Sequence, residues 1–283
     1  MKIITWNVQN CRGCDGRIDA KRIVEHARAL ADFDVLCLQE VSDGFEPLDA
    51  GENQFARLGA LLPGFTGVAG HAVDLLAPGG GRARFGNLLL TRLPVAHILR
   101  HALPQPFDDA PRSMPRLMLE ATLLTQTGPL RVMTTHLEYF SGTQRAAQID
   151  AIRRAHANAC DQAHRAPATI APTSPYGGTP HTASAILTGD FNFRPEDPLH
   201  ATMHESFGDA YTPPFVDAWQ SCYPNVPQPD TVGIYDRAQW PEAFACDFMF
   251  VTEDLLPRVE RLEVETVTQA SDHQPMLLVL GDV

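Results

Sequence analysis

The chain has 283 residues, of which 44% are hydrophobic, so it can bury a large core as one sizeable domain or two small ones. Its 22 Lys and Arg residues against 34 Asp and Glu residues give a formal net charge of −12, which excludes a surface that attracts polyanions as a whole. The sequence shows no signal-peptide pattern and no apolar run of the ~18 residues that a membrane span needs, so we expect a cytoplasmic protein without stable membrane association.

The first part of the chain alternates between strand and helix patterns. Mostly apolar runs with β-branched residues at 2–8 and 34–40 predict strands, and between them apolar residues recur at helical spacing over residues 17–31. A second helical pattern lies at 54–62. The chain is therefore expected to begin as strand, helix and strand.

Further strand candidates and the strongest helical pattern occupy the middle of the chain. The strand candidates cover residues 86–93, 95–99, 116–124 and 130–137. The last two of them are joined by "TQTGP", which predicts a hairpin turn. Residues 144–164 are rich in Ala and carry apolar residues at helical spacing, which predicts a long helix.

A segment rich in Pro and Gly, at about 166–183, separates this helix from the final strands. Such a segment is either a domain linker or a loop inserted within one domain. The strand candidates that follow it are of the same kind as those in the first half, and they cover residues 184–191, 246–252, 259–267 and 275–280. We therefore expect a single domain over residues 1–283, with stacked β-sheets inside and helices packed outside.

Acidic, amide or imidazole side chains follow the apolar strands, in "ITWN", "LCLQE", "TTHLE", "LTGDFN", "CDF" and "SDH". If the strand ends meet at one edge of a sheet, they collect Asn7, Glu40, His136, Asp190, Asn192, Asp247, Asp272 and His273 in one pocket. Each of these residues alone has an ordinary structural explanation, such as a turn or a buried histidine with a partner. Their joint occurrence behind predicted buried strands indicates a metal and acid/base site.

The motifs "TWNVQN", "LCLQEV", "FGNLLLTRLP", "VMTTHLE", "LTGDFNFRP", "ACDFMFV" and "SDHQPM" run from residue 3 to about 280. In this order they resemble the endonuclease/exonuclease/phosphatase superfamily, the deoxyribonuclease I-like group. The resemblance implies a four-layer α/β sandwich, in which two mixed β-sheets pack face to face and are flanked by helices. It also implies a metal-dependent phosphoesterase.

The resemblance implies a Mg²⁺ or Mn²⁺ site, and both ions prefer oxygen ligands. By this resemblance Glu40 is the metal ligand, Asn7 lies beside it, and Asp272 completes the metal site.

Five further residues receive catalytic roles from the same resemblance. Asp190 orients or deprotonates the attacking water, and Asn192 donates a hydrogen bond to water or phosphate. His273 donates to a phosphate oxygen, while Asp247 fixes its tautomer and favours its charged form. His136 matches the position of a second histidine that contacts the phosphate.

Three arginines are candidate substrate-binding residues. Arg116 opens a predicted strand and matches a site where some family members hold an arginine for the phosphate, although an exposed cation at a strand edge explains it equally well. Arg145 begins the long helix, where solubility is the alternative explanation. Arg12 lies in the loop after the first strand, at the expected rim of the site.

We expect the reaction to be hydrolysis of a phosphodiester by a metal-activated water, as in an endo- or exonuclease. The alternative is a phosphomonoesterase or phosphodiesterase that acts on a small or lipid-derived phosphate, as inositol phosphatases and sphingomyelinases do. A non-catalytic binding module is the second alternative, and it predicts the loss of a required polar residue, which this sequence does not show. The expected partner is a phosphate-ester substrate, with nucleic acid among the candidates, and no protein partner is implied.

Overall fold

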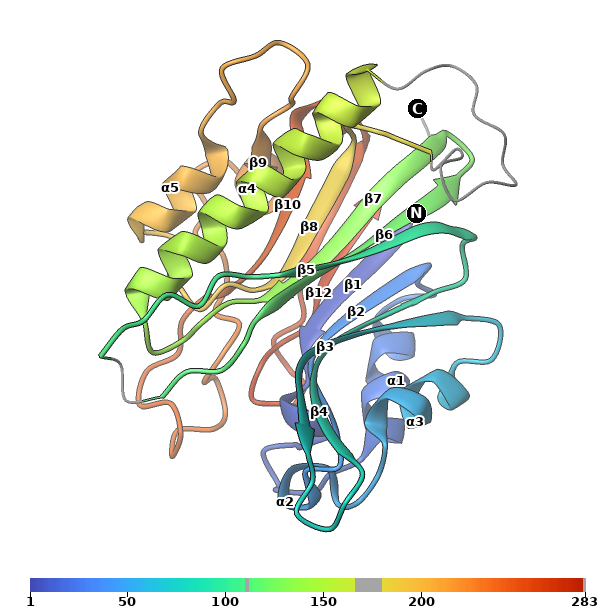
Figure 1. Ribbon diagram of the computed structural model, residues 1–283, viewed down its shortest axis with the longest axis vertical. Helices are drawn as coiled ribbons and strands as arrows, with labels where there is room; N and C mark the ends of the chain where they lie inside the picture. Colours follow the sequence, from blue (N-terminus) through green and yellow to red (C-terminus); the bar gives the residue numbers. More distant parts are fainter. Residues whose placement is uncertain (110–111, 166–179, 282–283) are drawn as a thin grey trace.

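The computed structural model of the protein describes residues 1–109, 112–165 and 180–281. Most of the Pro/Gly-rich segment that we expect to be an inserted loop, residues 166–179, lies outside this description. Two six-stranded sheets dominate the fold (Figure 1). In spatial order the first sheet contains β11 (Val259–Val264), β12 (Met276–Leu280), β1 (Lys2–Asn7), β2 (Val35–Asp43), β4 (Arg82–Thr91) and β3 (Thr66–Leu76). The second contains β5 (Val95–Ala102), β6 (Leu117–Thr125), β7 (Gly128–His136), β8 (Ala185–Asp190), β10 (Asp247–Thr252) and β9 (Phe215–Asp217).

Both sheets are mixed. In the first, β1 and β2 are parallel and the other neighbours are antiparallel, and in the second only β7 and β8 are parallel. A helix connects the strands of each parallel pair, as a parallel crossover requires. The expected hairpin is confirmed, because β6 and β7 pair directly from Thr125 and Gly128 onward.

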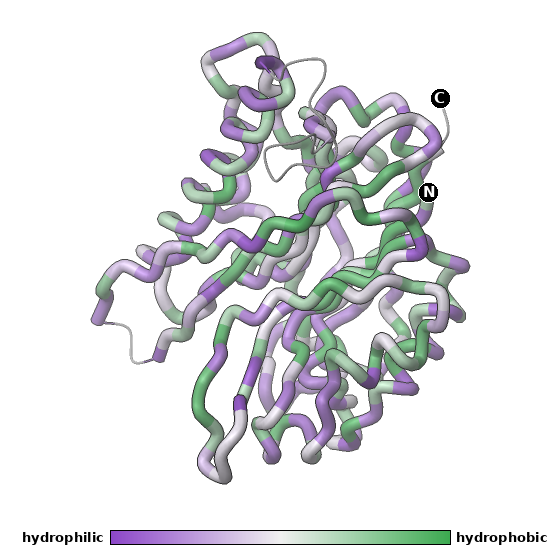
Figure 2. Tube along the Cα trace, turned by 45° about the vertical axis from the view of Figure 1, so that its right-hand side comes forward, coloured by the Kyte–Doolittle hydropathy of each residue, from purple (hydrophilic) through white to green (hydrophobic). Residues whose placement is uncertain are grey.

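The longer helices cover the outer faces of the sheets. The helices are α1 (Ala20–Leu30), α2 (Glu46–Asp49), α3 (Gln54–Leu61), α4 (Gly142–Arg165), α5 (Pro198–His204) and α6 (Ala218–Cys222), with 3₁₀ turns η1 (Gln9–Cys11) and η2 (Glu253–Arg258). In Figure 1, α1 and α3 lie on one side of the pair of sheets, and α4 and α5 lie on the other. Figure 2 shows hydrophobic residues concentrated along the central strands. The expected four-layer α/β sandwich is confirmed.

Side-chain alternation in the strands explains why the sheets are buried on both faces. In β2, Val35 and Cys37 pack between the two sheets, whereas Leu36 and Leu38 pack toward α1 and α3. Successive side chains point to opposite faces of a strand, so a strand covered on both faces is apolar throughout. This arrangement leaves the strand ends, rather than the strand faces, as the place where polar groups can gather.

No helix within the described ranges has both the length and the hydrophobicity that crossing a membrane requires.

Candidate active site

The structure brings the predicted polar residues to one edge of the two sheets. Asn7 ends β1, His136 ends β7 and Asp190 ends β8, while Asp247 opens the antiparallel β10. In the second sheet Asp190 is in register with His136 on one side and with Asp247 on the other. β12 runs antiparallel to β1, with Met276 opposite Thr5, so the segment that precedes β12 and carries Asp272 and His273 also lies at this edge.

Two carboxylates share one amide at the centre of the site. The side-chain amide of Asn7 donates through Nδ2 to Glu40 Oε1 and to Asp190 Oδ2, at 3.0 Å each. The imidazole of His136 faces the same two groups, with Nε2 at 3.6 Å from Asp190 Oδ2 and 3.9 Å from Glu40 Oε1. Strands from both sheets therefore meet here, and Asn7 fixes the separation of the two carboxylates.

The backbone at Glu40 is in the left-handed region, with φ 59°. The β2–β4 register shifts between Leu38 and Val41, so Glu40 lies in a β-bulge. A bulge turns a side chain away from the regular alternation of the strand. The bulge thus explains how Glu40, which follows a run of buried residues, presents its carboxylate at the sheet edge.

His273 and Asp247 form a buried pair beside this centre. His273 Nδ1 lies 2.8 Å from Asp247 Oδ2, and the hydroxyl of Thr231 donates to the same carboxylate oxygen at 2.6 Å. The carboxylate accepts the proton on Nδ1 and so fixes the imidazole ring. Nε2 then faces Asp190 Oδ2 at 3.8 Å, so His273 connects the two aspartates.

The pKa values show how strongly these charges act on one another. Burial and the carboxylate of Asp247 raise the pKa of Asp190 to about 7. Burial, followed by the negative charge of Asp272, raises the pKa of Glu40. Burial alone would lower the pKa of His273, but Asp247 and Asp272 raise it well above the ordinary value. The site is therefore a buried group of carboxylates with one imidazole that favours its charged form.

His136 behaves oppositely to His273. Burial and the positive charges of Arg116 and His273 lower the pKa of His136 well below its ordinary value. A neutral imidazole is a metal ligand or a hydrogen-bond partner rather than a cation. His136 therefore favours its neutral form and His273 its charged form, although both lie at the same sheet edge.

The donor set fits a divalent cation. Two groups of three close ligand atoms occur in the described part of the chain, and both include Asp190. One combines Glu40, His136 and Asp190, and the other combines Asp190, Cys246 and His273. Glu40 and Asp190 are acids whose raised pKa values report unfavourable burial of negative charge, which a bound cation would relieve. The oxygen-rich group around Glu40 suits Mg²⁺ or Mn²⁺ better than the thiol-containing group does.

Asp272 is held by hydrogen bonds rather than placed in either of these groups. Its Oδ2 accepts from Trp240 Nε1 at 2.9 Å and from Gln239 Nε2 at 3.2 Å, and its Oδ1 accepts from Ser271 Oγ at 3.2 Å. The negative charge of Asp272 still acts on both Glu40 and His273. Asp272 is thus at the site, and the expected metal set of Glu40, Asn7 and Asp272 stays a prediction.

Asn192 adopts a left-handed turn immediately after β8, with φ 53°. Its backbone N–H donates to Asp190 Oδ1 at 2.9 Å, and its side-chain Nδ2 donates to the carbonyl of Leu137 at 2.8 Å. Asn192 therefore orients Asp190 and joins the turn after β8 to the turn after β7. One N–H of its amide is used in this way, and the other is left for water or phosphate.

The model of the Endonuclease/Exonuclease/phosphatase family matches residues 4–273 of the chain. The protein belongs to this family. Endonucleases, exonucleases and phosphatases are all hydrolases of phosphate esters, so membership sets the type of bond and leaves the substrate open. A comparison with curated protein sequences found no match.

Solved structures with the same fold have low sequence identity to this chain. An endonuclease/exonuclease/phosphatase from Bacteroides vulgatus has a TM-score of 0.69 and 19% identity, with 99% of this chain and 97% of that chain covered. A mannosyl-6-phosphatase from Bacteroides thetaiotaomicron has a TM-score of 0.67 and 17% identity, and both chains are covered completely at 100%. The human Nocturnin catalytic domain with bound sulfate anion has a TM-score of 0.61 and 18% identity, with 98% of this chain and 92% of that chain covered.

Of the three candidate arginines, Arg116 lies close enough to Glu40 and Asp190 for their charges to act on it. Arg116 is 6% exposed, and its Nε donates to Glu138 Oε2 at 3.2 Å. The alternative of an exposed strand-edge cation is therefore wrong. Its Nη1 is buried and has no hydrogen-bond partner among the described residues, while the charges of Glu40 and Asp190 act on it. Arg116 thus offers an unused donor beside the carboxylates.

The other two arginines hold turns together. Arg12 donates to the carbonyls of Gly16 and Pro47, both at 3.0 Å. Arg145 donates through Nη1 to the carbonyls of Glu138 at 2.7 Å and Tyr139 at 3.0 Å. Both guanidinium groups donate to backbone carbonyls, and a contact of either with substrate stays a prediction.

Sequence reasoning missed the residues that support the site. They are Trp6, Thr231, Gln239 and Trp240, which contact the motif residues, and Glu138, the buried partner of Arg116. Glu138 was visible as the acid of "THLE", two residues after His136. Thr231 and Trp240 lie in the irregular stretch between α6 and β10, where no periodicity marks a residue as close to the site.

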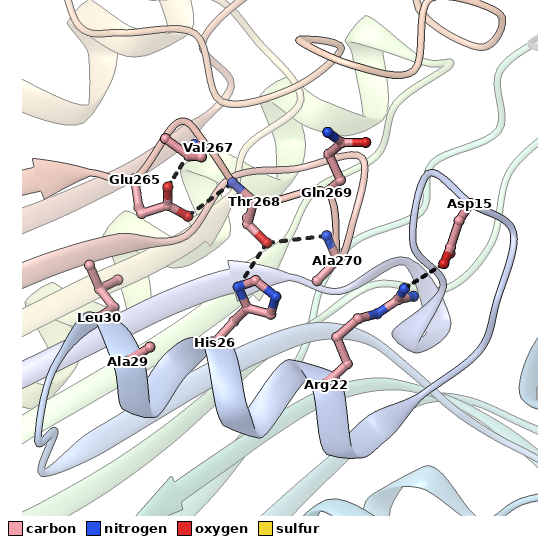
Figure 3. Close-up of a pocket in the computed structure, with 10 residues that line it drawn as sticks. All are labelled: Asp15, Arg22, His26, Ala29, Leu30, Glu265, Val267, Thr268, Gln269 and Ala270. Carbon is pink, nitrogen blue, oxygen red and sulfur yellow. Dashed lines mark hydrogen bonds and ion pairs between the residues drawn. The ribbon is translucent and has the colours of Figure 1, made fainter.

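A separate cavity of about 550 Å³ lies between α1 and the segment 265–270 (Figure 3). Four of its polar side chains form two pairs, Arg22 with Asp15 at 2.9 Å and His26 Nδ1 with Thr268 Oγ1 at 3.2 Å, and Glu265 accepts from the backbone of Val267 and Thr268. None of the carboxylates or histidines of the family motifs lines it. This cavity is therefore distinct from the candidate active site, although Ala270 in its wall directly precedes Ser271.

Proposed function

We propose that the protein is a divalent-metal-dependent phosphodiesterase of nuclease type. The observation that carries this proposal is the His273–Asp247 pair, whose free imidazole nitrogen faces Asp190 beside the Asn7-bridged carboxylates. Family membership supports hydrolysis of a phosphate ester, and the metal, the diester and the nuclease character are the proposed refinements.

Asp190 is the proposed general base. A carboxylate with a pKa raised to about 7 by burial and by Asp247 removes a proton from water more effectively than an ordinary, weakly basic carboxylate. Hydrogen bonds from Asn7 and from the backbone of Asn192 hold its two oxygens in place. The base is thereby fixed in position before substrate arrives, which lowers the cost of reaching the transition state.

His273 and Arg116 are the proposed donors to the phosphate. With Nδ1 bonded to Asp247, a protonated His273 donates from Nε2 to an oxygen that gains charge in the transition state. The unpartnered Nη1 of Arg116 supplies a second charged donor. Glu40 would hold the metal, with His136 beside it, and the metal would neutralise phosphate charge and lower the pKa of water.

The charges of the site favour a diester over a monoester. A monoester brings two negative charges to a site that already holds Glu40, Asp190, Asp247 and Asp272, whereas a diester brings one. Phe248, the residue after Asp247, does not bear on this choice. Its ring is buried against Phe191 and Phe193 on the helix-covered face of the sheet, away from the strand ends.

The testing experiment is hydrolysis of bis(p-nitrophenyl) phosphate with Mg²⁺ or Mn²⁺, before and after treatment with EDTA. We expect turnover that EDTA abolishes and added metal restores. A companion panel of p-nitrophenyl phosphate, mannose 6-phosphate, inositol phosphates and phospholipids tests the monoester and lipid alternatives, and the mannosyl-6-phosphatase neighbour supports the monoester alternative. Absence of metal-dependent hydrolysis of every diester and monoester would refute the proposed enzyme.

The metal assignment has a readout that does not depend on turnover. Mg²⁺ should raise the melting temperature of the wild type, because a ligand that binds only the folded state stabilises it. Glu40→Gln should remove this increase, and without metal it should not lower the melting temperature, since the buried charge of Glu40 is itself unfavourable. Glu25→Gln, which removes an exposed partner of Lys21, is the control that should keep the increase.

A further inference from the structure

Three aromatic side chains form a group beside the candidate site. Tyr139 and Phe140 follow the buried Glu138, and their rings meet edge to face at 4.9 Å between centroids. The ring of Trp240, from the stretch between α6 and β10, lies 5.7 Å from the ring of Tyr139. Tyr139 is 44% exposed and Phe140 is 49% exposed. We call these three residues the aromatic rim.

The aromatic rim begins at the catalytic groups. The ring of Trp240 lies 6.4 Å from that of His273, at an interplanar angle of 88°, and its Nε1 donates to Asp272 Oδ2 at 2.9 Å. From His273 the rings of Trp240, Tyr139 and Phe140 therefore follow one another outward. A substrate whose phosphate meets His273 can place one of its two neighbouring groups next to these rings.

The backbone that carries the exposed rings is fixed. Arg145 donates to the carbonyls of Glu138 and Tyr139, and the N–H of Phe140 donates to Glu138 Oε1 at 2.9 Å. Glu138 is itself fully buried and paired with Arg116. Rings that are exposed but held in place lose little freedom on binding, so they suit recognition. This arrangement gives Arg145 a role in holding the backbone that carries the exposed rings.

The surroundings of the aromatic rim suit a flat, weakly polar ring. Two nearby polar side chains already have partners: Gln239 contacts Gln9 and Asp272, and Nη1 of Arg145 donates to backbone carbonyls. A sugar, with a hydroxyl on almost every carbon, would need unengaged donors and acceptors at this place. A nucleobase gains most of its contact by stacking on an aromatic face, which needs no hydrogen bond.

The charge of the chain limits the length of such a substrate. With a net charge of −12, the protein lacks the overall positive field that holds many phosphates along a polynucleotide. Recognition through one or two bases next to the scissile phosphate avoids this difficulty. We propose that the aromatic rim stacks against a nucleobase, so that the substrates are short nucleotide phosphodiesters; this inference rests on the proposed phosphodiesterase function.

The test compares two substrates that differ only in a base. One is the dinucleotide thymidylyl-thymidine, and the other carries an abasic sugar analogue in place of one nucleoside, prepared for either side of the phosphate. We expect the wild type to prefer the complete dinucleotide in kcat/KM by roughly tenfold, within the range of stacking on one aromatic ring. Tyr139→Ala should reduce this ratio to about one, mainly by raising KM for the complete dinucleotide.

Two control variants separate stacking from a structural effect. Tyr139→Phe keeps the ring and should keep the preference. Leu76→Ala removes an exposed apolar side chain at the end of β3, 75% exposed, and should also keep it. Circular dichroism and melting temperature establish that each variant is folded. We expect Tyr139→Ala to fold, because the side chain of Tyr139 is exposed.

Each remaining outcome counts against a specific proposal. If the wild type cleaves both substrates at equal rates, the stacking inference is wrong while the phosphodiesterase stands. If Tyr139→Ala lowers the rates on both substrates by the same factor, Tyr139 has a structural role and the inference is again wrong. If neither these substrates nor bis(p-nitrophenyl) phosphate is cleaved, both proposals fall.

Discussion

At the scale of single residues, the pairing of His273 with Asp247 makes the sharpest prediction. His273→Ala should lower kcat roughly 10²- to 10³-fold, because a positioned donor to the transition state is worth about 3 kcal/mol or more. The substrate KM should change much less, since the donor acts mainly on charge that develops during the reaction. Steady-state hydrolysis of bis(p-nitrophenyl) phosphate at saturating metal measures both constants.

The chain contains a matched control for this substitution. His200 and Asp217 form a second buried pair, 3.0 Å apart, in which His200 contacts Phe193 and Phe248 on the helix-covered side of the second sheet. His200→Ala also leaves a buried aspartate without its partner, so both variants should lose stability. Only His273→Ala should lose turnover per folded molecule, and equal losses in the two variants would argue against a catalytic role for His273.

The sequence predicted the residues of the site better than their contacts. Asn7, Glu40 and Asp190 were found because each follows an apolar run. Asp247 and His273, which were expected behind strands as well, instead open β10 and precede β12, and they reach the same edge because these two strands run antiparallel to β8 and β1. The bridging role of Asn7, and the engagement of Asp272 by Trp240 rather than by the Glu40 group, depend on side chains from segments that are distant in the sequence. No local pattern encodes such pairings.

At the scale of the elements, the close approach of β7 and β8 depends on Gly189. Gly189 has φ +141°, and a Cβ there would lie 1.9 Å from the carbonyl oxygen of Thr135 on β7. Gly189→Ala should therefore destabilise the protein by about 2 kcal/mol or more, as strained backbone and steric overlap do. Urea unfolding should show a lower midpoint with an unchanged m-value.

Gly59 provides the opposite case within the same chain. It lies inside α3, and a Cβ built there would meet nothing within 4 Å. Gly59→Ala should raise the free energy of unfolding by about 0.5–1 kcal/mol, because Ala loses less backbone entropy than Gly in a helix. A similar effect of the two substitutions would contradict the packing of Thr135 against Gly189.

The contact between α4 and β7 makes the stability depend on pH. His156 Nδ1 lies 2.6 Å from Nη2 of the buried Arg131, and its Nε2 lies 2.9 Å from the carbonyl of Pro213. The arginine can only donate, so Nδ1 accepts and the imidazole is neutral. Burial and the charge of Arg131 accordingly lower the pKa of His156 from 6.5 to about 4.

A lowered histidine pKa means that the unfolded chain binds more protons than the folded one between pH 4 and 6.5. The contribution of His156 is fully present above pH 6.5 and is lost as the pH falls toward 4, by about 3 kcal/mol. His156→Gln, which can accept from Arg131 and donate to Pro213, should flatten this part of the profile. The measurement is urea unfolding at several pH values. If the free energy of unfolding depends on pH in the same way for wild type and variant, the prediction for His156 is wrong.

Elements with strong periodicity were predicted well, and irregular ones were not. The helix expected at 144–164 is α4, Gly142–Arg165, and the first two strands are β1 and β2. The strand β3, Thr66–Leu76, was missed because it contains Gly67 and Gly70 and its outer residues are exposed, so no alternation marks it. Its position is set by pairing with β4, along with a close approach of Gly70 to Leu117, and not by its own propensity.

At the scale of the whole molecule, most of the strands and their buried character were predictable, but β3, β9 and the order of the strands in the sheets were not. Each sheet has one parallel pair formed across a helix, and β12 pairs with β1 from the other end of the chain. Such pairing is decided by which apolar faces cover one another, which a single sequence does not reveal. The resemblance to a known family supplied the sandwich that periodicity alone left open.

The net charge of −12 makes a final prediction about long substrates. A protein that contacts 6–10 phosphates loses roughly 10³–10⁵ in affinity when salt rises from about 50 to 200 mM. Here salt screens a net repulsion instead, so kcat/KM for a long single-stranded oligonucleotide should rise or stay within about threefold over that range. The rate on bis(p-nitrophenyl) phosphate, measured at the same salt concentrations, corrects for any effect of salt on the chemistry or on metal binding. A steep linear fall of log kcat/KM with log salt would instead reveal a local basic track along the substrate path, and would favour a true polynucleotide nuclease over an enzyme for short nucleotide phosphodiesters.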